Sequence, residues 1–246
     1  MLGDLAGRGP VVVVSPHLDD GVFGCGQLLA AHPGSVVVTV FAGRPPRYDV
    51  LTAWDAAAGF RPDDDMVGLR RDEDRAALTL LGARPVWLDF RDAQYGDSPS
   101  VDVVSGALEA AIREVDAPSV FIPLGLFHSD HHLAHDAALD VMRRRQERSW
   151  FAYEDAVYRG IPDLLEERLT TLRRDGLIAG SPVSAPECGR EAKRQAMQFY
   201  RSQLRALAAP GYPGYDDALA AERYWPLAAG VQAAGGTSDG AGRHGG

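Results

Sequence analysis

The sequence predicts an α/β fold, and three observations carry this prediction. Runs of β-branched and other apolar residues at 11–15, 36–41 and 119–123 are typical of strands buried on both faces of a parallel sheet. Segments with helical patterning separate these runs, as a doubly wound sheet requires. The length of 246 residues suits one domain. We therefore expect a single domain with a Rossmann-like, mostly parallel sheet flanked by helices.

The first elements form a βαβ unit, in which a helix at 21–32 joins parallel strands at 11–15 and 36–41 by a right-handed crossover. The other expected elements, in chain order, are a long loop at 42–65, a helix at 68–81 ended by Gly82, a short strand at 86–88, an Asp-rich loop at 89–99, a helix at 101–115, the strand at 119–123, a helix from 128 to about 148, a strand at 150–158 and a helix at 191–207. The domain then covers residues 1–227, and the Ala/Gly-rich composition of 228–246 predicts a disordered tail.

Charge and composition disfavour several classes of partner. The formal net charge is −9, and an acidic surface repels nucleic acids and anionic membranes. The N-terminus lacks the basic region of a signal peptide, and no apolar run approaches the length of a membrane span. Cys25 and Cys188 form neither a disulfide framework nor a metal-binding pair. We expect a cytoplasmic protein without nucleic-acid or membrane partners; the sequence carries no signal for an oligomeric state.

Two polar clusters follow buried strands. His17, Asp19 and Asp20 come directly after the strand at 11–15, and a segment with four histidines, 128–135, comes after the strand at 119–123. In open parallel sheets, ligands bind beyond the carboxyl ends of the strands. The two clusters therefore mark a candidate site, although either aspartate could instead cap the helix that follows.

The spacing within the clusters suits a catalytic metal. His17 and Asp20 are three residues apart and can face one point, which leaves Asp19 free to handle the proton of a water molecule. If His131 completes the set, three protein ligands leave one position open, as in catalytic zinc sites. His131 and His135 are four residues apart, so these two histidines could be the ligand pair instead.

The same residues carry a resemblance to a known family. Pro-His-Leu-Asp-Asp at 16–20 and His-Ser-Asp-His at 128–131 resemble the two signature blocks of the PIG-L/LmbE-like N-deacetylases, including the GlcNAc-PI de-N-acetylase type. Similarities in the helix that contains Arg70 and in the segment from Lys193 to Gln203 extend the match over about residues 11–205. The sequence departs from the family pattern at Leu18, where proline is typical, and at Gly21, where an acidic residue is frequent.

The resemblance implies a role for each residue of the two blocks. His17, Asp20 and His131 would be the metal ligands, and Asp19 would be the general base. His128 would stabilise the tetrahedral intermediate and protonate the leaving amine, and Asp130 would orient a neighbouring histidine. Residues 1–227 would thus form a deacetylase domain.

Four further residues are candidates for substrate contacts. Arg70 and Arg71 match the family's Arg-rich helix and could bind substrate hydroxyls or phosphates, or simply form a solvated helix face. Asp92 and Tyr95 lie in the Asp-rich loop and could contact sugar hydroxyls or serve ordinary turn chemistry. Trp54, in the long loop, could belong to a lid that stacks on a sugar ring.

The resemblance implies a zinc-dependent N-deacetylase, a hydrolase that removes an N-acetyl group from a small molecule or glycoconjugate containing an amino sugar. Ferrous iron is an alternative to Zn²⁺, because His and Asp ligands suit several divalent ions. Two other functions stay open, namely an amidase that acts on a thiol-sugar conjugate and a non-catalytic sugar- or metal-binding relative. The presence of both Asp19 and His128 favours an enzyme.

Overall fold

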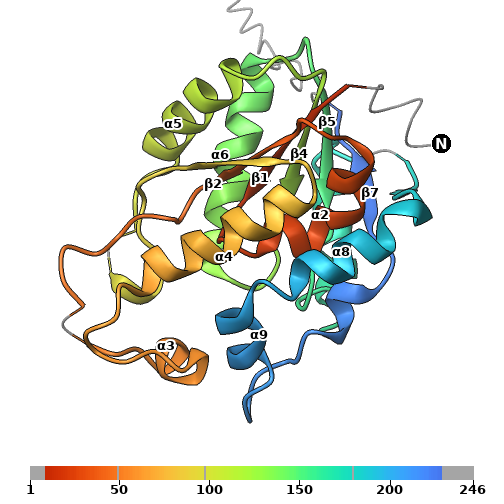
Figure 1. The fold of residues 1–246 in the computed structure, drawn as a ribbon. Helices are drawn as coiled ribbons and strands as arrows, with labels where there is room; N and C mark the ends of the chain where they lie inside the picture. Colours follow the sequence, from red (N-terminus) through yellow and green to blue (C-terminus); the bar gives the residue numbers. More distant parts are fainter. Residues whose placement is uncertain (1–8, 49, 97, 179, 229–246) are drawn as a thin grey trace, which may run out of the picture.

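The computed structural model of the chain describes residues 9–48, 50–96, 98–178 and 180–228. Its centre is a seven-stranded sheet with the strand order β3-β2-β1-β4-β5-β7-β6 (Figure 1). The strands are β1 (Val11–Ser15), β2 (Val36–Thr39), β3 (Arg84–Trp87), β4 (Ser119–Pro123), β5 (Ser149–Tyr153), β6 (Val183–Ser184) and β7 (Arg223–Pro226). The strands from β3 to β5 are parallel, whereas β7 is antiparallel to both β5 and β6. The predicted α/β class with a mostly parallel sheet is confirmed.

Helices cover both faces of the sheet (Figure 1). They are α2 (Asp20–Ala31), α3 (Ala53–Ala58), α4 (Met66–Leu80), α5 (Val101–Arg113), α6 (Ser129–Arg144), α7 (Leu164–Arg174), α8 (Arg190–Met197) and α9 (Arg201–Leu207), with 3₁₀ turns η1 (Ala93–Tyr95), η2 (Glu187–Gly189) and η3 (Asp216–Leu219). Alternate valines of β1 point to opposite faces: Val12 and Val14 pack with α5 and α6, and Val11 and Val13 pack with α2 and α4. Because both faces are covered, β1 needs apolar side chains at every position up to Ser15.

The strand order places β1 at a topological switch point. The chain runs from β1 to β2 and β3 on one side, and β4 and β5 lie on the other. Val11 pairs with Ser119 and Val13 with Phe121 in the parallel ladder, so both strands end at the same edge of the sheet. Crossovers that leave in opposite directions open a crevice at this edge, and both polar clusters follow strands that end there.

The helix expected at 191–207 is two helices, so the prediction of one continuous helix is wrong. The chain breaks between α8 and α9, where Tyr200 is fully buried and donates a hydrogen bond to Asp74 at 2.8 Å. Glu73 then accepts hydrogen bonds from the backbone N of Ser202 at 2.9 Å and from its hydroxyl at 2.6 Å, which satisfies the first turn of α9. These tertiary contacts override the helical periodicity of the segment.

Other differences are local. The long loop contains α3, which Thr52 caps by accepting a hydrogen bond from the backbone N of Asp55 at 3.0 Å. β5 ends at Tyr153, five residues before the predicted end, and α7, β6 and β7 were not predicted. The tail predicted at 228–246 lies, apart from its first residue, outside the described residues. Among the described residues, no helix has the length and hydropathy that a membrane span needs.

A buried ion pair bridges a kink in α2, the helix that begins at the site. Cys25 has non-helical backbone angles (φ −135°, ψ 16°), which frees backbone groups on either side. Lys193 donates to the carbonyl of Phe23 at 2.7 Å, and Glu222 accepts from the backbone N of Gln27 at 2.9 Å and of the next residue at 3.2 Å. The two charges lie 2.7 Å apart and are almost fully buried. The pair therefore replaces the hydrogen bonds that the kink removes.

We expect Glu222→Ala to lower the free energy of unfolding by about 3–5 kcal/mol, because it leaves the Lys193 charge buried without its partner. The matched control is Glu191→Ala, which removes an exposed carboxylate from its pair with Arg194 on α8 and should leave stability unchanged. Denaturant titration measures both variants. Equal midpoints and slopes for Glu222→Ala and the unmodified protein would contradict the role of this pair.

Candidate metal-binding active site

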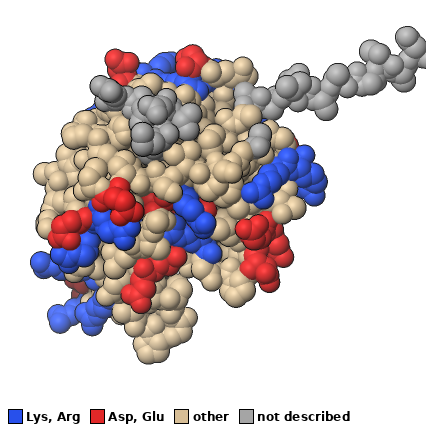
Figure 2. All heavy atoms as spheres, turned by 90° about the vertical axis from the view of Figure 1, so that its right-hand side faces the viewer, with Lys and Arg blue, Asp and Glu red and all other residues tan. Residues whose placement is uncertain are grey.

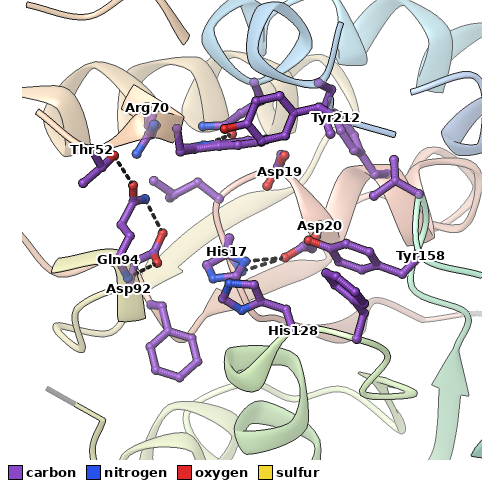
Figure 3. Close-up of a pocket in the computed structure, with 18 of the residues that line it drawn as sticks. His17, Asp19, Asp20, Thr52, Arg70, Asp92, Gln94, His128, Tyr158 and Tyr212 are labelled. Carbon is purple, nitrogen blue, oxygen red and sulfur yellow. Dashed lines mark hydrogen bonds and ion pairs between the residues drawn. The ribbon is translucent and has the colours of Figure 1, made fainter. Parts of the chain in front are cut away.

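The structure brings the two polar clusters together at the carboxyl ends of β1 and β4 (Figure 3). His17 Nε2 lies 3.0 Å from an oxygen of Asp130, although 113 residues separate them in the sequence. His131 Nε2 lies 3.1 Å from Asp20 Oδ2, and His17 Nδ1 lies 3.1 Å from the same oxygen. The expectation that the clusters meet at the strand ends rested on sheet topology, and the distances agree with it.

A tight turn after β1 fixes His17 and Asp20. The hydroxyl of Ser15 accepts a hydrogen bond from the backbone N of Gly21 at 2.7 Å and donates one to the carbonyl of His17 at 2.5 Å. The backbone N of His17 donates to Asp20 Oδ2 at 2.9 Å. A Cβ at Gly21 would come within 2.9 Å of Val37 and 3.2 Å of Ser15. The turn therefore favours glycine where the family pattern often has an acidic residue.

Asp19 is placed differently from Asp20. It occupies the N-cap position of α2, but its side chain makes no capping hydrogen bond, so helix capping does not account for it. Its carboxylate lines the cavity described below. Burial, together with the charge of Asp20, raises the pKa of Asp19 to about 7. A carboxyl group with a pKa near neutrality is suited to exchanging a proton with a substrate or a water molecule.

The start of α6 fixes the histidine segment. His128 is the N-cap residue, and its Nδ1 accepts a hydrogen bond from the backbone N of Asp130 at 3.2 Å. The proton of a neutral His128 is therefore on Nε2, which makes this nitrogen a donor. Burial and the neighbouring His17 lower the pKa of His128, which favours the neutral ring.

Two carboxylates bind one ring nitrogen each of His131 and His17. Asp155, which follows β5 and is fully buried, lies 2.5 Å from His131 Nδ1. Asp130 binds His17 Nε2 and also accepts a hydrogen bond from the backbone N of Ala93 at 3.0 Å. Burial opposes protonation of the His17 and His131 rings and lowers their pKa values. The hydrogen bonds and charges of Asp20, Asp130 and Asp155 outweigh this effect. The pKa of His131 is therefore raised to about 9, and that of His17 well above its usual value. The same negative field would attract a divalent cation, which displaces such protons on binding.

The donor set fits a divalent metal ion. One atom each from His17, Asp20 and His131 lie within 4.8 Å of one another. His131 Nε2 is buried, with 1% of the side chain exposed, and faces Asp20 Oδ2 at 3.1 Å without the alignment of a hydrogen bond, as expected of two ligand atoms directed at one ion. One atom each from His17, His128 and Asp130 also lie within 4.8 Å of one another. In that set Asp130 already binds a ring and a backbone amide, which favours an orienting role.

His135 belongs to neither of these sets. Its Nδ1 donates to the carbonyl of Pro123 at 2.7 Å, and burial together with the charge of Arg168 lowers its pKa to about 3. This geometry disfavours the alternative in which His131 and His135 form the ligand pair.

The site opens into a cavity of about 930 Å³, a volume typical of small-ligand pockets. Its floor is formed by His17, Asp19, Asp20 and His128 (Figure 3). Polar residues form one wall and aromatic residues much of the rest; the former are Thr52, Arg70, Asp92, Gln94 and Tyr95, and the latter include Phe41, Trp54, Phe127, Tyr158 and Tyr212. The cavity can therefore hold a ligand with both hydroxyl groups and apolar faces.

Three of the four predicted substrate contacts line this cavity. Arg70 is buried and donates to Asp55 at 2.7 Å and to the Tyr95 hydroxyl at 3.2 Å. Asp92 accepts hydrogen bonds from the backbone and side chain of Gln94 at 3.0 and 2.7 Å. Arg71 is not among the lining residues.

Arg71 points elsewhere. It donates to the carbonyl of Ala42 at 2.9 Å, and its guanidinium lies 5.2 Å from the centroid of the Trp87 ring. Trp54, the candidate lid residue, does line the cavity, and its indole N donates to Gln203 at 3.1 Å.

Several lining or supporting residues were not predicted, notably Asp155, Phe127 and Tyr158. Asp155 and Tyr158 were not considered as site residues because both fell within the strand expected at 150–158. β5 in fact ends at Tyr153, so both residues lie in the loop that follows it, at the edge of the sheet where the site lies. Had the end of β5 been predicted correctly, Asp155 and Tyr158 would have been candidates, because β5 is parallel to β4 and ends at the same edge of the sheet.

Comparison with known proteins identifies the family. The PIG-L family model, described as GlcNAc-PI de-N-acetylase, matches residues 12–142, which is more than half of the chain and includes both signature blocks. The chain belongs to the PIG-L family. The resemblance inferred from the PIG-L motifs is confirmed, and with it membership in a family of N-deacetylases.

Individual PIG-L relatives resemble the chain over most of its length. The 2'-N-acetylparomamine deacetylase of Streptomyces fradiae is 32% identical over 220 residues, which cover 80% of this chain and 74% of that protein. The crystal structure of the A40926 pseudoaglycone deacetylase Dbv21 matches with a TM-score of 0.73 at 30% identity, over 90% of this chain and 98% of that one. A crystal structure described as the zinc inhibited form of teicoplanin deacetylase Orf2 matches with a TM-score of 0.68 at 25% identity, over 89% and 98%.

Proposed function

We propose that this chain is a metal-dependent hydrolase that removes the acetyl group from an N-acetylated amino sugar within a small glycoside. The observation that carries the proposal is the convergence of His17, Asp20 and His131 beside the carboxylate of Asp19, which makes no helix-capping hydrogen bond and lines the cavity. The relatives that are named deacetylases of 2'-N-acetylparomamine and of the A40926 pseudoaglycone support the substrate class.

His17, Asp20 and His131 would hold the metal ion. The buried Nε2 of His131, which faces Asp20 Oδ2 at 3.1 Å, and the carboxylates that bind the other nitrogen of each ring fit this role. When bound, a divalent ion supplies a Lewis acid for the amide carbonyl and lowers the pKa of a water molecule. We propose Zn²⁺, with Fe²⁺ as the alternative that His and Asp ligands also accept.

Asp19 and His128 would handle the protons and the charge of the reaction. Asp19 accepts a proton from the attacking water, for which its uncapped position in the cavity suits it. His128 Nε2–H donates a hydrogen bond to the carbonyl oxygen as negative charge develops on it. The departing amine must be protonated, and protonated Asp19 or His128 can deliver that proton. Asp130 would orient the ring of His17.

The cavity would orient the sugar through its polar wall. Asp92 and Gln94 are positioned for sugar hydroxyls, with Thr52 donating to Gln94 at 2.6 Å to fix its amide. Arg70 and Tyr95, both tied to Asp55, form a stiff corner of the same wall. Arg71 lies outside the cavity lining, so a substrate contact there would need a ligand that extends beyond it. The cytoplasmic location expected from the N-terminal sequence stays a prediction.

We expect Asp155→Asn to weaken metal binding by about 10- to 100-fold, because an amide orients the His131 ring less strongly than a carboxylate and does not raise its basicity. Competition with a chromogenic chelator measures the dissociation constant. Asp217→Asn, which alters a partly exposed carboxylate that pairs with Arg159, is the control and should bind the metal normally. An unchanged dissociation constant for the metal in Asp155→Asn would contradict the proposed role of Asp155 in orienting His131.

Acetate release tests the function. The purified protein, loaded with one equivalent of Zn²⁺, is incubated with 2'-N-acetylparomamine, with methyl N-acetylglucosaminide and with an amide of a thiol-sugar conjugate. We expect acetate from the acetamido sugars. Hydrolysis of the thiol conjugate alone would favour the amidase alternative. Binding of these sugars without hydrolysis would favour the non-catalytic alternative.

A further inference from the structure

Phe127 occupies a strained turn at the edge of the active site. It has a φ of 61°, in the left-handed region that bulky residues rarely adopt. The backbone N of His128 donates to the carbonyl of Leu126 at 2.7 Å, which closes a three-residue turn around Phe127. Strain of this kind concentrates at functional sites, and here it lies directly before the N-cap of α6.

The side chain of Phe127, at this strained backbone position, is exposed. Phe127 lines the cavity and is 62% exposed, among the highest values for large apolar residues in the described part of the chain. An exposed ring at a strained position gains little from burial, so packing within the protein does not explain the residue. A bound ligand that covered the ring would gain the free energy of burying its apolar surface.

Tyr158 extends the ring of Phe127 toward the metal ligands. The two rings are stacked, with centroids 5.2 Å apart and planes 26° apart. Tyr158 also meets the ring of His131 edge-on, at 5.1 Å and 85°. We refer to Phe127 and Tyr158 together as the aromatic platform. Because Tyr158 contacts the ring of His131, a proposed metal ligand, a substrate whose amide reaches the metal must lie close to the platform.

We propose that the aromatic platform binds the apolar C–H face of the sugar ring that carries the scissile amide, which makes Phe127 a specificity-determining residue. This inference rests on the proposed function. A pyranose ring has a flat apolar face and polar edges, and the cavity offers the matching pair of surfaces. Figure 3 shows Asp92 and Gln94 on the opposite side of His17 and His128 from Tyr158. A sugar stacked on the platform therefore directs hydroxyls toward the polar wall. An acetyl group is too small to cover a phenyl ring.

Phe127→Gly separates a binding role from a structural one. Glycine adopts a positive φ without strain, so the turn and the orientation of the His128 ring should persist. The melting temperature should therefore not fall. Loss of one stacking partner should raise KM for 2'-N-acetylparomamine by about 3- to 10-fold and leave kcat within about twofold. Phe127→Tyr keeps a ring and should restore KM. Asp163→Gly is the matched control, since Asp163 also has a φ of 65° but does not line the cavity.

Four results would overturn the proposal. The first is an unchanged KM in Phe127→Gly. The second is a lower melting temperature with a lower kcat at unchanged KM, which would make Phe127 a structural support for His128. The third is a similar rise of KM in Asp163→Gly. The fourth is a loss that grows from the N-acetyl to the N-butyryl substrate, which would assign the ring to the acyl group.

Binding without turnover distinguishes the platform from the proposed function. Saturation-transfer NMR with methyl N-acetylglucosaminide measures contact with the ring protons of the sugar. If the unmodified protein releases no acetate from any acetamido sugar, the proposed function fails. The platform then stands only if the unmodified protein binds this glycoside and Phe127→Gly weakens that binding, and it falls if either condition fails.

Discussion

Asp19→Asn should lower the rate of acetate release by about 10²- to 10⁴-fold, the usual contribution of a general base. The amide has nearly the shape of the carboxylate but accepts no proton at neutral pH. Asp19 lines the cavity and makes no helix-capping bond, so its replacement should leave the turn after β1 intact. The steady-state rate on 2'-N-acetylparomamine, measured at saturating substrate, reports the effect.

Two controls accompany Asp19→Asn. The variant should retain the metal content of the unmodified protein, which separates loss of the base from loss of the ion. Asp116→Asn, at an exposed position after α5, should have full activity. A decrease of less than tenfold in Asp19→Asn would mean that another group accepts the proton, and the assignment of the base would be wrong.

Asp20→Ala should abolish both metal binding and hydrolysis. One oxygen of this carboxylate lies 3.1 Å from His17 Nδ1 and 3.1 Å from His131 Nε2, so it joins the two proposed histidine ligands. Two remaining ligands hold a divalent ion far more weakly than three do. Elemental analysis should show about one metal ion per chain in the unmodified protein and almost none in the variant.

His135→Gln serves as the comparison for Asp20→Ala. His135 lies one helical turn after His131 but outside both candidate ligand sets. The variant should therefore keep its metal. If His135→Gln lost the ion while Asp20→Ala kept it, the pair His131 and His135 would be the ligands instead. Circular dichroism of each variant shows whether it is folded, so that loss of metal is not confused with unfolding.

Sheet topology made the convergence of the site predictable from sequence. The valines of β1 are apolar without alternation because helices cover both faces, and this pattern is readable in the sequence. Parallel strands with right-handed crossovers put the segments after β1 and β4 at one edge. His17 and His131 were therefore expected at the same edge of the sheet, and they meet there because β1 and β4 are neighbouring strands.

Features that depend on tertiary contacts were not predictable in this way. The break between α8 and α9 follows from a hydrogen bond between Tyr200 and Asp74, which are 126 residues apart. Arg70 and Arg71 are neighbours with the same chemistry, yet only Arg70 points into the cavity, where Asp55 holds it. The turn at Phe127 has no sequence signature, because glycine or asparagine is the usual sign of a positive φ.

The surface adds a general constraint on partners. On the face shown in Figure 2, acidic and basic side chains are interspersed, so this face presents no continuous basic surface. The concentrated negative charge lies within the site, where Asp20, Asp130 and Asp155 surround two histidines. That arrangement suits a cation held inside the cavity.

The most direct test of the central claim is acetate release by the same protein sample before chelation, after removal of the metal, and after reloading with one equivalent of Zn²⁺ or Fe²⁺. The relative described in a zinc inhibited form makes a series with excess zinc informative as well. We predict that activity on 2'-N-acetylparomamine disappears with the metal and returns with one equivalent, in the unmodified protein but not in Asp20→Ala. Full activity in metal-free protein would contradict the account, as would a reloaded protein that holds the ion at His17, Asp20 and His131 but releases no acetate from any acetamido sugar.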